Sequence, residues 1–147
     1  MGAGGAEAES ATALNSGAIH LLRAVRRVDR EAGLPPAQLS ALSVLVFGGS
    51  LTLGVLAAAE DVAGPTMTRI VDGLVTRKLA ERRRSDDRRQ ARVVATASGR
   101  RLMLRARRRR VEVLAAALDA LPAADRRRLR AAGPLLDRLA AEVRAQS

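Results

Sequence analysis

The apolar residues near the start of the chain recur at the spacing of an α-helix. Between residues 12 and 31 they are separated by four, three, four and three positions, and the arginines of this stretch lie mostly outside that seam. Such a period predicts an amphipathic helix. The Gly-Leu-Pro-Pro run at residues 33–36 ends it. Proline can open a second helix, which we expect to reach Phe47 and to stop at the glycine pair 48–49.

The middle of the chain predicts two short helices in succession. Thr52 follows a short extended link and can cap a helix that reaches about Glu60. After a break at residues 61–64, a second helix starts near Pro65 and runs to Lys78. Two short helices joined by a tight turn form a helix-turn-helix.

A hairpin and two long helices are predicted for the second half. The segments 79–84 and 90–96 flank a polar Ser-Asp-Asp turn, which indicates two short strands. A helix then runs over 97–121. Its block of four arginines places at least one of them near the apolar seam, where it needs an acidic partner or must extend its head to water. The last helix begins at Pro122 and is kinked or restarted at Gly133-Pro134. The expected fold is mainly α with a small β-hairpin.

The composition removes several classes of function. The chain has no cysteine, which excludes disulfides, thiolate zinc sites and thiol nucleophiles, and one histidine supplies neither a metal cluster nor a conventional triad. The fifteen acidic residues are scattered or lie beside arginines. We therefore expect no enzyme activity and no cofactor. No apolar run reaches the ~18 residues of a membrane span. The Gly/Ala-rich start lacks the basic residues of a signal peptide, which predicts a flexible arm in a cytoplasmic protein.

The net charge of +11 is concentrated in one stretch of the chain. Residues 69–110 carry sixteen basic and four acidic residues, a balance of +12. Residues 1–68 have a balance of −2 and residues 111–147 a balance of +1. A positive field focused in this way indicates a polyanionic partner.

Two motifs lie in and beside this basic stretch. Residues 66–74 read Thr-Met-Thr-Arg-Ile-Val-Asp-Gly-Leu and are followed by Leu-Ala-Glu-Arg at 79–82. An Asp-Arg-Arg run at 87–89 is followed at fixed spacing by Thr96 and Gly99. In this order the motifs resemble the recognition helix and the wing of the MarR family, and the resemblance covers residues 12 to 145.

The resemblance implies a winged helix-turn-helix with long N- and C-terminal dimerisation helices. Residues 1–11 would form a flexible arm, residues 12–34 and 100–147 the helical dimerisation region, and residues 35–99 the DNA-binding region. The protein would be a sequence-specific regulator of transcription that binds double-stranded DNA.

Roles for individual residues follow from the resemblance. A recognition helix lies in the major groove with its N-terminal residues toward base edges, and here these are Pro65, Thr66, Met67, Thr68 and Arg69. In the wing, Arg89 would enter the minor groove, oriented by Asp87. Asp72 is expected to pair with an arginine of the wing or of a helix. Phosphates would be held by Arg82, Arg83, Arg84, Arg88 and Arg92.

By the same resemblance the protein is a homodimer that represses transcription from a near-palindromic operator. The seams of the first and last helices carry more Leu and Val than one small domain buries, which supports dimerisation. The interface residues would be Leu14, Leu21, Leu118, Leu135, Leu139 and Val143. In the family, a small lipophilic or phenolic effector binds between the dimer helices and the DNA-binding region. Its lining here would be His20, Leu21, Arg23, Leu42 and Phe47.

The chain departs from the family pattern at four places, of which one is Ala95 in place of the usual Leu. Lys78 stands where the family usually has glycine, so we expect the recognition helix to end without a left-handed cap. Ala63-Gly64 replaces the usual Ser or Asn cap, which leaves the start of the helix to Pro65 and Thr66. The turn before Asp87 is shorter than usual, which predicts a tighter wing tip.

Two other functions fit the basic composition. A non-specific nucleic-acid-binding protein would use the arginine runs, but such proteins usually hold bases on aromatic platforms, and this chain has one Phe and no Trp or Tyr. A membrane-surface protein would place its basic residues opposite a large apolar face, whereas here they fall on the predicted hairpin.

Overall fold

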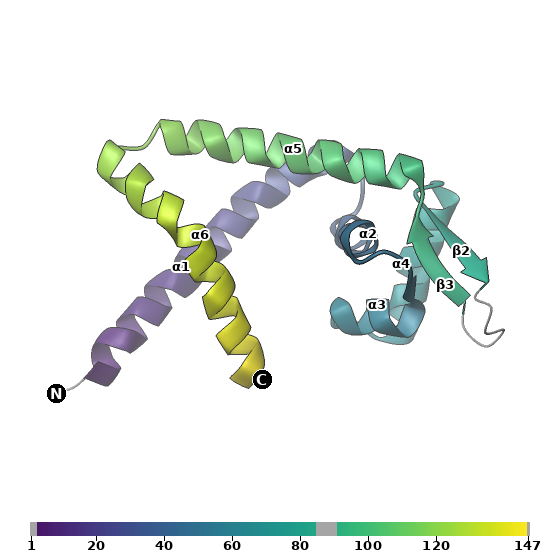
Figure 1. Cartoon of the computed structure of the whole chain (residues 1–147), viewed down its shortest axis with the longest axis horizontal. Coiled ribbons are helices and arrows are strands. Elements are labelled where there is room, and N and C mark those ends of the chain that lie inside the picture. The colour runs from purple at the N-terminus through teal and green to yellow at the C-terminus, as the bar shows by residue number, and fades with distance from the viewer. Residues whose placement is uncertain (1–2, 85–90, 147) are drawn as a thin grey trace. The chain divides into compact units, whose positions relative to one another are not determined.

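A computed structural model describes residues 3–84 and 91–146 of the chain. These residues form six α-helices, one short 3-10 helix and a small sheet, which confirms the predicted fold class, and Figure 1 shows the labelled elements along the chain. By contacts the chain divides into two compact units, Met1–Arg110 and Val111–Ser147. The elements are α1 (Ala3–Asp29), η1 (Arg30–Ala32), α2 (Pro36–Gly48), β1 (Leu51–Thr52), α3 (Leu53–Ala59), α4 (Gly64–Thr76), β2 (Ala80–Arg84), β3 (Ala91–Ala95), α5 (Ala97–Asp119) and α6 (Ala123–Gln146).

Helix α1 begins earlier than its apolar seam predicts. It starts at Ala3 rather than at Thr12, so most of the segment expected to form an arm is helical. Alanine is the strongest helix former, and the alanines of residues 3–11 outweigh the glycines that favoured an arm. The helix ends in the single turn η1, and Gly33 then reverses the chain with a φ of 71°.

The hydrophobic core belongs to the first unit. Every buried apolar side chain of the described residues lies between residues 34 and 103. Helix α2 contributes five core residues and is apolar on most of its surface, while α4 buries only one row of side chains, spaced by four and three positions. Ile70 and Val75 flank this row and are half-buried, while Pro65, Thr66 and Arg69 face solvent. The core consists of Leu34, Leu39, Ala41, Leu42, Leu45, Val46, Leu56, Ala57, Met67, Val71, Leu74, Leu79, Ala80, Val93 and Met103.

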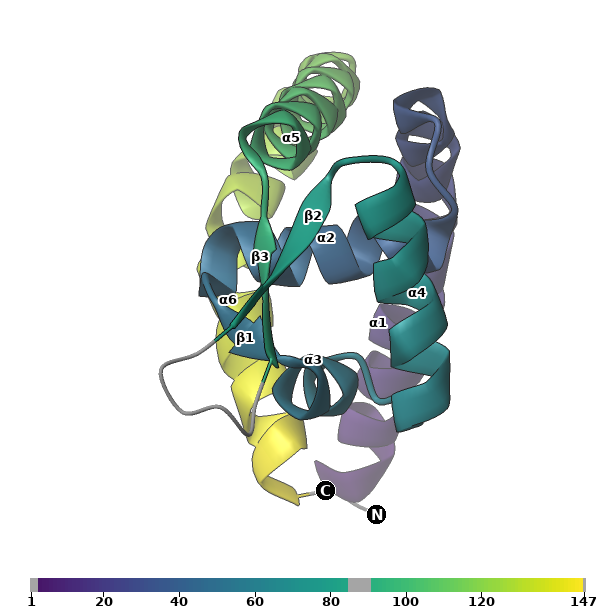
Figure 2. The same cartoon turned by 90° about the vertical axis from the view of Figure 1, so that its right-hand side faces the viewer.

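The three described strands form one antiparallel sheet in the order β1-β3-β2. Figure 2 shows β2 and β3 running side by side next to α2, α3 and α4. The extended link predicted before Thr52 is the third strand, paired with β3 through Leu51 and Val93. Val93 is fully buried, and its neighbour Arg92 is exposed. A slip of one residue would exchange them, so burial of Val93 determines the register.

Both helices of the helix-turn-helix begin and end as local chemistry dictates. The Thr52 hydroxyl accepts a hydrogen bond from the Val55 N–H at 3.3 Å, which confirms the predicted cap of α3. Helix α4 starts after Ala63 without a side-chain cap and has proline in its first turn, as its sequence predicts.

The carboxyl end of α4 differs from the prediction. Lys78 has a φ of 58°, so the left-handed cap that we expected to be missing is present. The Leu79 N–H donates to the Leu74 carbonyl at 2.9 Å, and the Lys78 N–H donates to the Val75 carbonyl at 2.8 Å. These two bonds, with the buried leucines at both ends of the longer one, are a Schellman motif. The motif forms although its left-handed residue is a lysine.

The start of α5 is attached to this same turn. The Thr96 hydroxyl donates to the Lys78 carbonyl at 2.8 Å and accepts from the Gly99 N–H at 3.1 Å, while the Thr96 N–H donates to the Leu79 carbonyl at 3.0 Å. A Cβ on Gly99 would overlap the Leu79 carbonyl oxygen. The threonine and glycine of the wing motif therefore join the end of α4, the sheet and α5.

The second unit has little interior of its own. Helix α6 has no buried residue, and the turn before it is bridged by an ion pair of 3.4 Å between Arg126 and Asp119. Within residues 3–84 and 91–146, none of the helices carries an apolar stretch long enough to cross a bilayer.

Replacing Lys78 by glycine should stabilise the protein. A left-handed conformation costs an ordinary residue roughly 1–2 kcal/mol, and part of this gain is offset by the greater freedom of glycine in the unfolded chain. We expect Lys78→Gly to raise the free energy of unfolding by about 1 kcal/mol in urea titrations. Arg77→Gly is the matched control, because Arg77 has an ordinary φ of −81°, and it should be destabilising. Equal effects of the two substitutions would contradict the left-handed turn.

Candidate nucleic-acid interface

Helix α4 presents a polar face opposite the core. Pro65, Thr66 and Arg69 are exposed and Thr68 is half-buried, all within the first two turns. Met67 was predicted to read bases with them, but it is 0% exposed. It lies on the row that packs into the core, so that prediction is wrong.

The amino end of α4 leaves backbone donors available. No side chain caps it, so the first N–H groups of the helix have no partner from a cap. Thr68 instead turns its hydroxyl back along the helix and donates to the Gly64 carbonyl at 3.0 Å. Unpaired N–H groups and the positive end of the helix dipole suit an anion such as phosphate.

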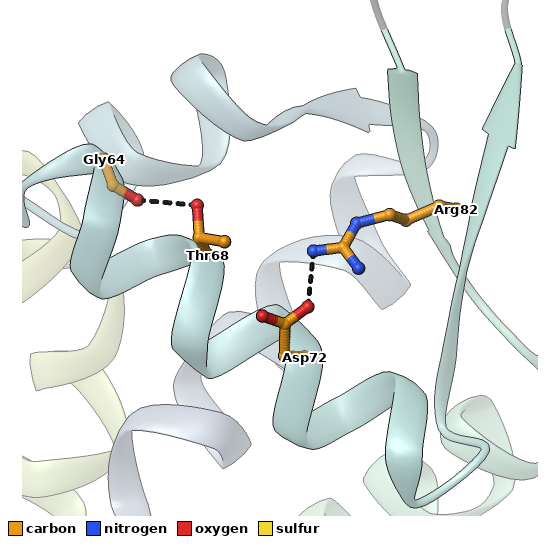
Figure 3. A network of polar contacts seen from close by, with 4 residues as sticks. All are labelled: Gly64, Thr68, Asp72 and Arg82. Atoms are coloured by element: carbon orange, nitrogen blue, oxygen red, sulfur yellow. Dashed lines mark hydrogen bonds and ion pairs between the residues drawn. The ribbon is translucent and has the colours of Figure 1, made fainter.

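An ion pair joins the recognition helix to the wing strand. The guanidinium of Arg82 donates to the Asp72 carboxylate at 2.7 Å, and Figure 3 shows the two side chains facing each other. This confirms that Asp72 pairs with an arginine. The pair is largely exposed, with side-chain exposures of 35% for Arg82 and 53% for Asp72, so its contribution to stability is small. Its effect is to hold β2 against α4 and to neutralise the one carboxylate on the polar face of α4.

Two further arginines face each other across the sheet. Arg83 on β2 is paired in register with Arg92 on β3, and like charges directly opposite each other are unfavourable. Each has a local acceptor: Arg83 donates to Glu81 at 2.6 Å, and Arg92 to the Ser50 carbonyl at 2.7 Å. Arg84 at the end of β2 has no partner within the described residues. The predicted wing residues Asp87, Arg88 and Arg89 lie outside the described residues.

The basic stretch faces solvent almost throughout. Among the described basic residues of 69–110, only Arg110 is partly buried. It pairs with Asp29 of α1 at 2.9 Å, and its neighbour Arg109 pairs with Glu31 at 3.0 Å. The prediction that one arginine of this block would find an acid is confirmed, although the partners lie some eighty residues away in the sequence.

A cavity of about 400 Å³ lies between the carboxyl end of α1, helix α2 and helix α5 of the first unit. Its apolar wall includes Leu34, Leu39 and Met103, and its charged rim includes Arg26 and Arg30. The sequence indicated a pocket on α1, but neither arginine was singled out. Their position near the end of the helix, beside Gly33, was the only available signal.

The predicted pocket residues do not line this cavity. His20, Leu21 and Arg23 are exposed on α1, and Leu42 is fully buried in the core. Phe47 is 58% exposed and lies under Arg107, whose guanidinium carbon is 5.5 Å from the ring centroid. Of the five, Phe47 lines a neighbouring pocket of about 310 Å³ together with Ser43 and Met103.

Comparison with known proteins decides the family. The model of the MarR family matches residues 32–91. An HTH-type transcriptional regulator of Mycobacterium bovis is 35% identical over 131 residues, which are 88% of this chain and 92% of that protein. The chain belongs to the MarR family.

Solved structures agree with this assignment over nearly the whole chain. A protein from Pseudomonas aeruginosa described as a transcriptional regulator has 33% identity and a TM-score of 0.77, over 92% of this chain and 96% of that one. A MarR family protein from Bacillus stearothermophilus has 24% identity and a TM-score of 0.82, over 97% and 99%. This MarR-family chain is therefore a DNA-binding transcriptional regulator with a winged helix.

Proposed function

We propose that this MarR-family regulator binds a near-palindromic operator as a homodimer and represses transcription by occupying it. The observation that carries the proposal is the polar face of α4, whose first two turns expose Thr66 and Arg69 beside a basic sheet. In this proposal residues 35–99 bind DNA, and residues 12–34 and 100–147 form the dimer. The regulator would act in the cytoplasm.

Base reading is assigned to the exposed first two turns of α4. Arg69 has no acidic partner within the described residues, so its guanidinium is available for the paired acceptors of a guanine. Thr66 and Thr68 offer hydroxyl and methyl groups of a size that suits base edges. A Staphylococcus aureus MepR variant solved bound to an oligodeoxyribonucleotide has the same fold, with a TM-score of 0.67 over 90% of this chain, which supports a DNA-facing winged helix.

Phosphate binding is assigned to the arginines of the sheet, with unequal shares. Arg84 is exposed and has no partner within the described residues, so it can bind phosphate at no cost in broken contacts. Arg83 would exchange Glu81 for phosphate. Arg82 holds Asp72, and its main role is to place the wing strand. The predicted minor-groove residue Arg89, with Asp87 and Arg88, extends this proposal into the wing tip.

Substitutions of Arg69 and Arg84 should have different effects on DNA binding. In binding selections from a random library, we expect Arg69→Ala to relax the preference at one base pair by ~1–3 kcal/mol. Arg84→Ala should leave base preference unchanged and lower the slope of log affinity against log salt by about 1. If both variants selected the parental sequence with the parental salt slope, neither α4 nor β2 would belong to the DNA interface. A non-specific nucleic-acid-binding protein, the alternative function, would show no base preference in either.

The dimer is proposed from exposed apolar rows on the terminal helices. Leu14 and Leu21 on α1 are 49% and 53% exposed, and Leu135 and Leu139 on α6 are 54% and 45% exposed. Leu118 on α5 is half-buried, and Val143 continues the α6 row. Exposed apolar rows of this kind mark an interaction site. A second copy of the chain suits it because two recognition helices about one DNA turn apart, roughly 34 Å, then read both halves of a near-palindrome.

Leu139→Asp should break the dimer and weaken operator binding together. Leu139 is exposed in the single chain, so the substitution should cost the fold little while placing a charge in the proposed interface. The control is Ala141→Asp, on the opposite side of α6, which should leave the dimer intact. Sedimentation equilibrium and operator titration measure the two properties. A monomeric variant with parental operator affinity would contradict the coupling.

An organic acid is proposed as the effector of the Arg26–Arg30 cavity. Its volume of about 400 Å³ lies in the range of small-molecule sites. Arg110 on its wall is already paired with Asp29, whereas Arg26 and Arg30 have no acidic partner within the described residues and can hold a carboxylate. Leu34, Leu39 and Met103 would accept the apolar body of the ligand. NadR in complex with 4-hydroxyphenylacetate has the same fold, with a TM-score of 0.70 over 90% of this chain.

Aromatic acids should stabilise the protein through these two arginines. We would titrate a panel of them, starting with 4-hydroxyphenylacetate, and follow thermal unfolding; a ligand at 100 times its Kd stabilises by about 2.7 kcal/mol. The double variant Arg26→Ala/Arg30→Ala should lose the effect, whereas Arg23→Ala, on the same helix but outside the cavity, should keep it. Equal stabilisation by the matching neutral amides would contradict an acid site. So would a panel in which no acid stabilises the protein.

A further inference from the structure

In the structure the Thr68 hydroxyl already uses its one donor, which leaves it only acceptor capacity for a partner. Its single proton lies in the 3.0 Å bond to the Gly64 carbonyl, and the direction of that bond is certain because a carbonyl oxygen cannot donate. Figure 3 shows the hydroxyl directed along the helix toward Gly64. The groups of Thr68 that stay available to DNA are the two lone pairs of the oxygen and the methyl group.

The neighbouring groups make the same division of donors and acceptors. Asp72 lies one turn further along the same side of α4, and its carboxylate is also an acceptor. Arg69 beside Thr68 and Arg82 across from Asp72 carry only donors. The acceptors Thr68 and Asp72 therefore lie one turn apart on α4, with the donor Arg82 facing Asp72.

We propose that Thr68 recognises the exocyclic amino group of a base, the N6 amino of adenine or the N4 amino of cytosine. These are the only donors that base pairs present in the major groove, whereas guanine N7 and O6, adenine N7 and thymine O4 are acceptors. A threonine with a free hydroxyl could bond to either kind. Because the back-bond of Thr68 uses its only hydroxyl proton, Thr68 cannot also donate to an acceptor on a base while that bond is kept. The inference rests on the proposed operator binding and assigns one specificity-determining residue within it.

The first step of the test finds the base pair that Thr68 reads. Operator selections are run with the full-length parent, Thr68→Val, which keeps the shape and loses the acceptor, and Thr68→Ser, which keeps the hydroxyl. Back-bonding of a threonine slightly destabilises a helix, so neither variant should unfold, and circular dichroism checks this. We expect one base pair whose preference is lost in Thr68→Val and retained in Thr68→Ser.

The second step removes single atoms from that base pair. Adenine is replaced by purine or cytosine by pyrimidin-2-one, which deletes the amino group. A 7-deaza purine, which deletes the N7 acceptor, is the control. Deleting the amino group should weaken binding by the parent about 3- to 10-fold, the value of one hydrogen bond, and should not weaken binding by Thr68→Val further. The 7-deaza change should have equal effects on the parent and on Thr68→Val.

Each result decides between defined outcomes. The inference would be overturned if deleting the amino group weakened binding by the parent and by Thr68→Val equally. It would also be overturned if deleting N7 weakened binding by the parent but not by Thr68→Val, or if Thr68→Val kept the parental base preferences. In all three cases the parent still selects a sequence, so the proposed operator binding survives. A parent that selects no sequence overturns the proposed function itself.

Discussion

The turn at Lys78 and Leu79 holds the DNA-binding face together. At this point α4 ends in a left-handed residue, β2 begins, and the Thr96 side chain and backbone attach the start of α5 to the same two carbonyls. Gly99 lets the backbone of α5 approach the Leu79 carbonyl more closely than any Cβ would permit. The direction of the recognition helix, the position of the wing strand and the origin of the long helix are therefore set by one cluster of backbone hydrogen bonds. The side chains of α4 therefore project from a helix whose carboxyl end is anchored at this turn.

On this face of the protein, the pairing of the charges matters as well as their sum. A balance of +12 over residues 69–110 draws any nucleic acid toward the molecule. Yet Arg82 and Arg83 are paired with Asp72 and Glu81, so part of the positive charge is held by acids of the same face. An arginine that is already paired with an acid gains less free energy from binding a phosphate than an unpaired arginine does, because it gives up its ion pair. In the proposed complex the acids reduce non-specific attraction and leave discrimination to the residues of α4 that are assigned to base reading.

Local pattern predicted the elements, and tertiary packing determined what the pattern could not show. The seams of α2, α4 and α5 repeat every three to four residues, and a repeat of that kind is visible in any single sequence. Met67 was assigned to DNA because the resemblance places the first turns of α4 in the groove, although it lies four positions before Val71 on the buried row. The left-handed turn at Lys78 was missed because propensity disfavours it, while buried leucines at both ends of the motif require it. The Arg26–Arg30 cavity was missed because its walls come from α1, α2 and α5, whose proximity exists only in the folded chain. Motif spacing did indicate Asp72, because a carboxylate on the outer face of a basic helix needs a cation within reach.

The central claim is that this face reads sequence rather than charge alone. Genomic fragments recovered by binding selection, and shuffled copies of the same length and composition, can be titrated against the full-length protein at one physiological salt concentration. The account predicts that the recovered fragments bind at least about 1,000-fold more tightly, the lower end of the range for specific regulators. Equal affinities for recovered and shuffled DNA would contradict it.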